Sequence, residues 1–137
     1  MAGIRATNTR PEMILRRGLH ALGFRFRLHG RKLPGKPDII LRRFRAVIFV
    51  HGCFWHGHDC PLFRWPKTRE VFWREKIGGN RVRDKLVDDE LRASGWRVLH
   101  VWECSLRGTG KLGPEKVIEL AASWVKSDER RGEIKGE

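Results

Sequence analysis

Residues 46–50 read Ala-Val-Ile-Phe-Val, a run of five consecutive apolar side chains. A short, continuous apolar run of this kind is typical of a strand that is buried on both faces of a sheet. Working outward from it, three further stretches have the composition of strands, and they cover residues 24–28, 38–41 and 96–102. The sequence therefore predicts a sheet whose central strand is covered on both sides.

Helical patterns alternate with these strands. Thr9-Arg10-Pro11-Glu12 has the form of a capping box, and we expect the helix that follows to end at Gly23. Further helices are predicted over residues 68–77, interrupted at Gly78-Gly79, then from residue 80 to Gly95, and over residues 114–125. Residues 126–137 are expected to fray. The whole pattern predicts one α/β domain, residues 1–137, with a mixed central sheet flanked by helices.

The charge of the chain is unevenly distributed. Its 137 residues carry a net charge of +13, and residues 1–45 hold 12 of the 29 Lys and Arg but only two acidic residues, Glu12 and Asp38. A basic charge gathered in one third of a folded chain indicates a polyanionic partner, most often nucleic acid, and a solubilising surface is the alternative. No apolar run reaches about 18 residues, and no signal peptide is apparent, so we expect a cytoplasmic protein with no membrane segment.

Metal-ligating side chains crowd the stretch His51-Gly52-Cys53-Phe54-Trp55-His56-Gly57-His58-Asp59-Cys60. Three His and two Cys in ten residues suit zinc, and a closed structural site needs four ligands. We predict Cys53, Cys60, Cys104 and His58 as this set, because His58 lies only two residues from Cys60. Buried free cysteines beside surface histidines are the alternative interpretation.

A second constellation contains oxygen and imidazole groups. Asp38 begins one predicted strand, Val50 ends the next, and His51 and His56 follow directly. If those strands are neighbours, a carboxylate, a main-chain carbonyl and two imidazoles meet at one edge of the sheet. Such a site suits Mg²⁺, which accepts one or two protein oxygens and can polarise a phosphodiester.

Five motifs stand out along the chain: Leu-Pro-Gly-Lys-Pro-Asp at residues 33–38, Val-Ile-Phe-Val-His-Gly-Cys-Phe-Trp-His at 47–56, Phe-Trp-Arg-Glu-Lys-Ile-Gly at 72–78, Gly-Trp-Arg-Val-Leu at 95–99 and Val-Trp-Glu-Cys at 101–104. Together they resemble the motifs of the very short patch repair (Vsr) DNA mismatch endonucleases. The resemblance implies a restriction-endonuclease-like fold with a structural zinc site. It also implies a Mg²⁺-dependent enzyme that nicks one strand 5′ of the T in a T·G mismatch produced by deamination of 5-methylcytosine.

The resemblance also implies roles for individual residues. Asp38 looks like the carboxylate that binds the catalytic Mg²⁺, and Val50 stands where the family uses a main-chain carbonyl as a further ligand. His56 resembles the essential histidine that handles protons, and Glu12 resembles an acid that holds water on the metal. Glu12 acting only as a helix cap is the alternative.

Other positions match supporting roles. His51 and Asp84 correspond to active-site positions, although His51 could be structural and Asp84 a surface ion pair. Phe54, Trp55 and Trp73 match aromatic residues that intercalate beside the mismatch, with Trp73 in the helix core as the alternative. The family's zinc ligands fall on the four residues already chosen from their spacing.

The resemblance further implies double-stranded DNA as the partner of a monomer, together with a mismatch-repair ATPase. Typical members carry an additional basic segment before the first matched helix, whereas eight residues precede Thr9 here. This difference motivates one alternative, a nickase or restriction-type endonuclease of the same fold without mismatch specificity. A zinc-stabilised DNA-binding module without enzymatic activity is the second alternative.

Overall fold

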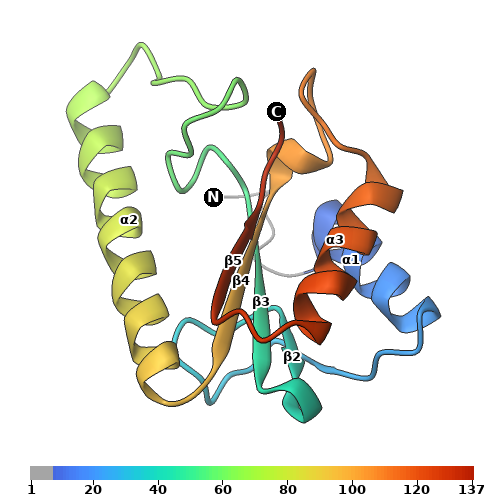
Figure 1. Ribbon diagram of the computed structural model, residues 1–137. Coiled ribbons are helices and arrows are strands. Elements are labelled where there is room, and N and C mark those ends of the chain that lie inside the picture. The colour runs from blue at the N-terminus through green and yellow to red at the C-terminus, as the bar shows by residue number, and fades with distance from the viewer. Residues whose placement is uncertain (1–7) are drawn as a thin grey trace.

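A computed structural model describes residues 8–137 and shows a central sheet between two helical layers (Figure 1). Helix α2 covers one face, and helices α1 and α3 cover the other. The mixed α/β architecture expected from the sequence is confirmed. In chain order the elements are α1 (Arg10–Ala21), β1 (Arg27–Leu28), β2 (Ile39–Leu41), β3 (Ala46–His51), α2 (Glu70–Ala93), β4 (Arg97–Trp102), α3 (Pro114–Lys126) and β5 (Arg131–Ile134), with short 3-10 turns at Arg42–Phe44 and Glu103–Ser105.

The five strands lie in the order β1-β2-β3-β4-β5. The pairs β1–β2 and β2–β3 are antiparallel, whereas β3–β4 and β4–β5 are parallel. Side chains of β3 alternate between the two faces, so that Ile48 joins the core under α1 and α3 while Val47 and Phe49 join the core under α2. This double burial explains why residues 46–50 are apolar without interruption.

Helix α1 begins and ends at the residues predicted from the sequence. The Thr9 side chain accepts a hydrogen bond from the Glu12 backbone N–H, and Gly23 follows the helix with a φ of 97°. Leu15 and Leu19 are fully buried against α3 and the sheet. The capping residues therefore fix where Glu12 lies relative to the strands.

The predicted interruption at Gly78-Gly79 is wrong, because α2 runs unbroken for 24 residues through both glycines. Each glycine costs a helix about 1 kcal/mol. Contacts on either side offset this cost: Ile77 is fully buried, and Asn80 donates from Nδ2 to the Trp55 carbonyl at 2.7 Å. Packing against the sheet and against the loop between β3 and α2 thus holds the helix continuous.

The expectation that residues 126–137 fray is also wrong. Residues 131–134 form β5, which pairs in parallel with β4 and places Ile134 opposite Val101 in the core. Beyond the strand, the Gly136 N–H donates to the Cys104 sulfur at 3.3 Å. Arg-Gly-Glu-Ile is too short and too polar for the sequence alone to indicate a strand. The segment is ordered because it pairs with β4.

Among the described residues, none of the helices is both long enough and apolar enough to span a membrane.

Candidate active site

The centre of the candidate site is the junction of β2 and β3. Asp38 immediately precedes β2, and its Oδ2 accepts a hydrogen bond of 2.7 Å from the Val50 backbone N–H on β3. Burial raises the pKa of Asp38 to about 7; the Val50 N–H opposes this shift, while the nearby Glu12 carboxylate adds to it. The predicted meeting of Asp38 and Val50 at one sheet edge is present.

Glu12 reaches this junction from α1 and is almost completely buried, with 1% of its surface exposed. Its Oε2 accepts a hydrogen bond from Arg16 at 2.8 Å and lies 2.9 Å from the His29 Nε2. Its Oε1 accepts a hydrogen bond from the Asn8 backbone N–H. Glu12 therefore takes part in the cap and also faces the junction. Ligand atoms of Glu12, His29 and Asp38 all lie within 4.8 Å of one another, a spacing at which they could share a metal ion.

His29 was not predicted as a site residue. It follows β1, and its backbone N–H donates to the Asp38 carbonyl at 3.0 Å, so the pairing of β1 with β2 brings it beside Asp38. A histidine among basic and apolar neighbours gives no local signal. Only the register of the two strands reveals its place.

Imidazoles enter the site from β3 and from the loop that follows it. His56 Nδ1 contacts the Asp84 carboxylate of α2 in a short hydrogen bond. The rings of His51 and His56 lie 4.3 Å apart between centroids. Burial, together with the neighbouring His56 and His100, lowers the pKa of His51 well below its usual value of 6.5. Asp84 is therefore paired with His56 and not with a basic residue of its own helix.

These groups share one cavity of about 1030 Å³. Asp38, Val50, His51, His56 and Asp84 all line it. The aromatic residues Phe54 and Trp55 form another part of its wall.

Trp73 of α2 completes an aromatic cluster with these two rings. Its ring centroid lies 5.3 Å from that of Phe54 and 5.7 Å from that of Trp55. All three side chains are only partly buried. We call Phe54, Trp55 and Trp73 the aromatic cluster.

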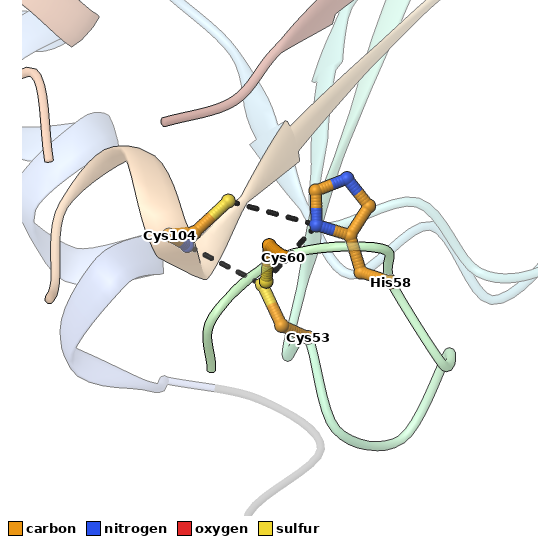
Figure 2. A group of neighbouring side chains, drawn as sticks. All are labelled: Cys53, His58, Cys60 and Cys104. Carbon is orange, nitrogen blue, oxygen red and sulfur yellow. Dashed lines mark hydrogen bonds between the residues drawn. The ribbon is translucent and has the colours of Figure 1, made fainter. Parts of the chain in front are cut away.

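A second group of ligands, here called the Cys–His cluster, consists of Cys53, His58, Cys60 and Cys104 (Figure 2). Three come from the loop after β3, and Cys104 comes from the turn after β4. Their ligand atoms lie within 4.8 Å of one another, and His58 Nδ1 is 3.6 Å from the sulfurs of both Cys53 and Cys104. The four residues chosen from spacing are therefore brought together, and they could hold a metal ion.

The surroundings of the Cys–His cluster suit a cation. Burial raises the pKa of the Cys53 and Cys104 thiols and lowers the pKa of His58. Backbone N–H groups of Cys104 and Gly136 donate to the sulfurs of Cys53 and Cys104, each at 3.3 Å, as partners of a thiolate do. A bound cation would supply the positive charge that the buried thiolates need.

The sequence interpretation also missed His100 and Asp88. His100 lies in the centre of β4, and its ring nitrogens contact His51 and Asp88. A polar residue inside an otherwise apolar predicted strand was a usable signal for His100. Asp88 lies four residues after Asp84 on the same helix face, which was a usable signal for Asp88.

Comparison with known proteins places these features in one class. Residues 1–62 match the family model described as DNA mismatch endonuclease Vsr. The Type II nicking enzyme V.XorIIP of Xanthomonas oryzae is 51% identical over 82% of this chain and 82% of its own length. The DNA mismatch endonuclease Vsr of Escherichia coli is 46% identical over 91% of this chain and 80% of its own. The Type II nicking enzyme V.NmeAIP of Neisseria meningitidis is 43% identical over 78% and 76%.

The site and these relatives define the class: the chain is a DNA endonuclease, and its partner is DNA. With relatives of this similarity covering most of both chains, it belongs to the Vsr family of DNA mismatch endonucleases.

Proposed function

We propose that the chain is a Mg²⁺-dependent, zinc-stabilised endonuclease with a restriction-endonuclease-like fold. It nicks one strand of duplex DNA 5′ of the T in a T·G mismatch of the kind that deamination of 5-methylcytosine produces. The observation that carries this proposal is the single cavity that holds Asp38, Val50 and the His56–Asp84 pair beside two aromatic rings. The similarity to the Escherichia coli DNA mismatch endonuclease Vsr supports the mismatch as substrate.

Asp38 and the Val50 carbonyl are the residues that would hold Mg²⁺, and Glu12 would hold water on the metal. The N–H and C=O of one strand residue point to the same side, and the Val50 N–H points at Asp38, so the carbonyl is on that side too. Bound Mg²⁺ would polarise the scissile phosphate and favour ionised oxygen ligands. Burial and the nearby Glu12 carboxylate raise the pKa of Asp38, which means that they destabilise its ionised form. A cation at the junction would stabilise that form.

His56 is the proton-handling residue of the proposal. The Asp84 carboxylate can only accept, so His56 Nδ1 carries the hydrogen, and a neutral ring then has a lone pair on Nε2. That nitrogen can accept a proton from the attacking water while Asp84 stabilises the resulting imidazolium. His56 comes from the loop between β3 and α2, and Asp84 comes from α2 itself. The position of α2 therefore determines the orientation of the His56 ring.

Zinc is the metal that best fits the Cys–His cluster. Tetrahedral zinc with sulfur ligands at about 2.3 Å and nitrogen at about 2.05 Å places sulfur and nitrogen about 3.6 Å apart. Both sulfur–Nδ1 distances from His58 have this value. A zinc ion here would tie the loop that carries His56 to the end of β4, so its role would be structural.

The aromatic cluster is the proposed reader of the mismatch. Side chains inserted between base steps unstack DNA at a cost of a few kcal/mol, and this cost is smallest where pairing is already weak. Phe54 and Trp55 lie between Cys53, held in the Cys–His cluster, and His56. Inserted rings would therefore sit at a fixed distance from the site of cleavage.

The test is single-turnover cleavage of a labelled duplex that contains one T·G pair, with the matched T·A duplex as control. We expect one nick 5′ of the T in the mismatched duplex only, dependent on Mg²⁺ and abolished by Asp38→Asn. Equal cutting of both duplexes would instead support the alternative, a nickase without mismatch specificity, in line with the two relatives that are named as Type II nicking enzymes. Retention of full activity by Asp38→Asn would refute the proposed metal site.

From the family likeness we also propose that the enzyme acts as a monomer and works with a mismatch-repair ATPase. Sedimentation of the protein with a T·G duplex tests the first point, since a monomer gives one chain per duplex. Stimulation of nicking by the ATPase tests the second.

A further inference from the structure

A chain of buried hydrogen bonds runs from the wall of the catalytic cavity to the C-terminal strand. His51 Nε2 lies 2.7 Å from His100 Nδ1, and His100 Nε2 lies 2.9 Å from Asp88 Oδ1. The other oxygen, Asp88 Oδ2, accepts a hydrogen bond of 3.2 Å from Arg131 Nε. The four residues belong to β3, β4, α2 and β5, so the chain of bonds crosses the sheet and joins it to the helix.

Three of these four residues are almost completely buried, and Arg131 is exposed. His51 is 7% exposed, and His100 and Asp88 are each 6% exposed. The Phe49 ring stacks on both imidazoles, at 5.7 Å from His51 and 5.6 Å from His100. The His51–His100 and His100–Asp88 bonds are therefore buried, and water has little access to replace them, whereas Asp88 Oδ2 also lies 3.5 Å from Arg92 at the exposed end.

The hydrogen-bond partners determine which ring nitrogen of each histidine carries its hydrogen. Burial opposes the ionisation of Asp88, but its hydrogen bond with His100 and the charge of Arg131 hold its pKa below the ordinary value, so it is a carboxylate and only accepts. His100 must then carry its hydrogen on Nε2. We take His100 as neutral, so that its Nδ1 accepts; His51 then carries its hydrogen on Nε2 and keeps a lone pair on Nδ1.

We propose that Asp88 and His100 are positioning residues for cleavage, which fix the tautomer and ring plane of His51 within the catalytic cavity. His51 lines that cavity with its ring centroid 4.3 Å from that of His56, so a rotated or inverted ring would change the surroundings of His56 directly. The inference rests on the proposed catalytic site and extends it by two residues that do not themselves bind substrate.

A purely structural role explains this arrangement less well. Replacing buried polar networks by apolar side chains is often neutral or stabilising, so stability alone gives little reason for two histidines and an aspartate in the core. One end of the network is the ion pair of Asp88 with the exposed Arg131, and the other end is His51, which lines the cavity. An Asp–His–His series is the arrangement that selects one tautomer at its far end.

The test uses Asp88→Asn, with Asp89→Asn as the matched control. The amide introduced at position 88 can donate to His100 Nε2, which would move the His100 hydrogen to Nδ1 and the His51 hydrogen from Nε2 to Nδ1. Asp89 is the next residue on the same helix and is exposed. It pairs with Arg92, which also lies 3.5 Å from Asp88, so the control makes the same change of charge at the same arginine and leaves the bonds of Asp88 to His100 and Arg131 in place.

Two measurements are needed, namely single-turnover cleavage with DNA affinity, and ¹⁵N NMR of the His51 and His100 ring nitrogens. We expect Asp88→Asn to lower the cleavage rate about 10–100-fold while DNA affinity stays within about twofold, as for other partners that orient a catalytic group. The NMR spectrum should show the His51 hydrogen transferred to Nδ1. Asp89→Asn should match the wild type in both measurements.

Three outcomes overturn the inference: equal rates for the two variants, a lower rate with an unchanged His51 tautomer, or a wild-type protein in which His51 carries its hydrogen on Nδ1. The last measurement needs no variant, so it decides the question even if Asp88→Asn does not fold. Failure of the proposed function would be distinguishable, because Asp38→Asn would then remain active whatever the tautomer of His51.

Discussion

Replacing Asp38 by Asn should make the Mg²⁺-free protein more stable at alkaline pH while abolishing cleavage. The carboxyl group is buried beside Glu12, and these surroundings raise its pKa from 3.8 to about 7. The folded chain thus binds a proton that the unfolded chain has already lost, and the free energy of unfolding falls as pH rises from about 4 to about 7. Asn has no such cost and can still accept from the Val50 N–H.

The size of the effect follows from the same values. One pH unit between the two pKa values corresponds to about 1.4 kcal/mol, so the complete loss is about 4 kcal/mol. About half of it falls between pH 5.5 and pH 8.5, and partial contact of Asp38 with solvent reduces that portion to about 1–2 kcal/mol. The stability advantage of Asp38→Asn over the wild type should therefore grow by about 1–2 kcal/mol across this range.

The assay is urea unfolding at both pH values, followed by the fluorescence of the six tryptophans. Chelators are left out, because they would also strip a metal from the Cys–His cluster. Mg²⁺ should restore the stability of the wild type at pH 8.5 and have no such effect on Asp38→Asn. Asp89→Asn, an exposed change of the same charge, should show no pH-dependent difference. An advantage of Asp38→Asn that does not change with pH would refute the reasoning.

Three further changes test other parts of the structure. Ile134→Ala should lower the free energy of unfolding by about 2–4 kcal/mol in urea denaturation, because the side chain is 5% exposed in the core; a loss below about 0.5 kcal/mol would mean that β5 is not docked. Cys60→Ser should reduce bound zinc from one ion per chain to less than half in elemental analysis, and full retention would remove Cys60 from the ligand set. Trp55→Ala should weaken binding to a T·G duplex by about 1–3 kcal/mol in a fluorescence titration, whereas an equal loss on matched DNA would contradict mismatch reading.

Features with local causes were predictable from the sequence. The cap at Thr9 and the stop at Gly23 depend on residues within one turn of the helix ends. The apolar run at 46–50 predicts a strand buried on both faces from its own composition, without reference to other parts of the chain. The Cys–His cluster was predictable because three of its ligands lie within eight residues, and only Cys104 had to be assigned from a distant strand end.

Features that depend on tertiary pairing were not predictable. The glycines of α2 carry a local preference against helix, and contacts made by Ile77 and Asn80 with distant segments outweigh it. The position of His29 next to Glu12 depends on the register between β1 and β2. The partnership of His100 with Asp88 likewise requires knowing which face of α2 meets β4.

The pairing of β5 at the sheet edge has a consequence for protein synthesis. A ribosome releases the chain from its N-terminus, so Asp38, His56 and all four residues of the Cys–His cluster emerge before residues 131–136 do. Yet the Arg131 bond to Asp88 and the Gly136 bond to the Cys104 sulfur both come from residues 131–136. A nascent chain that already displays the candidate catalytic groups therefore still lacks the strand that supports them. Cleavage competence should arise only once residues 131–136 have emerged and β5 has paired with β4.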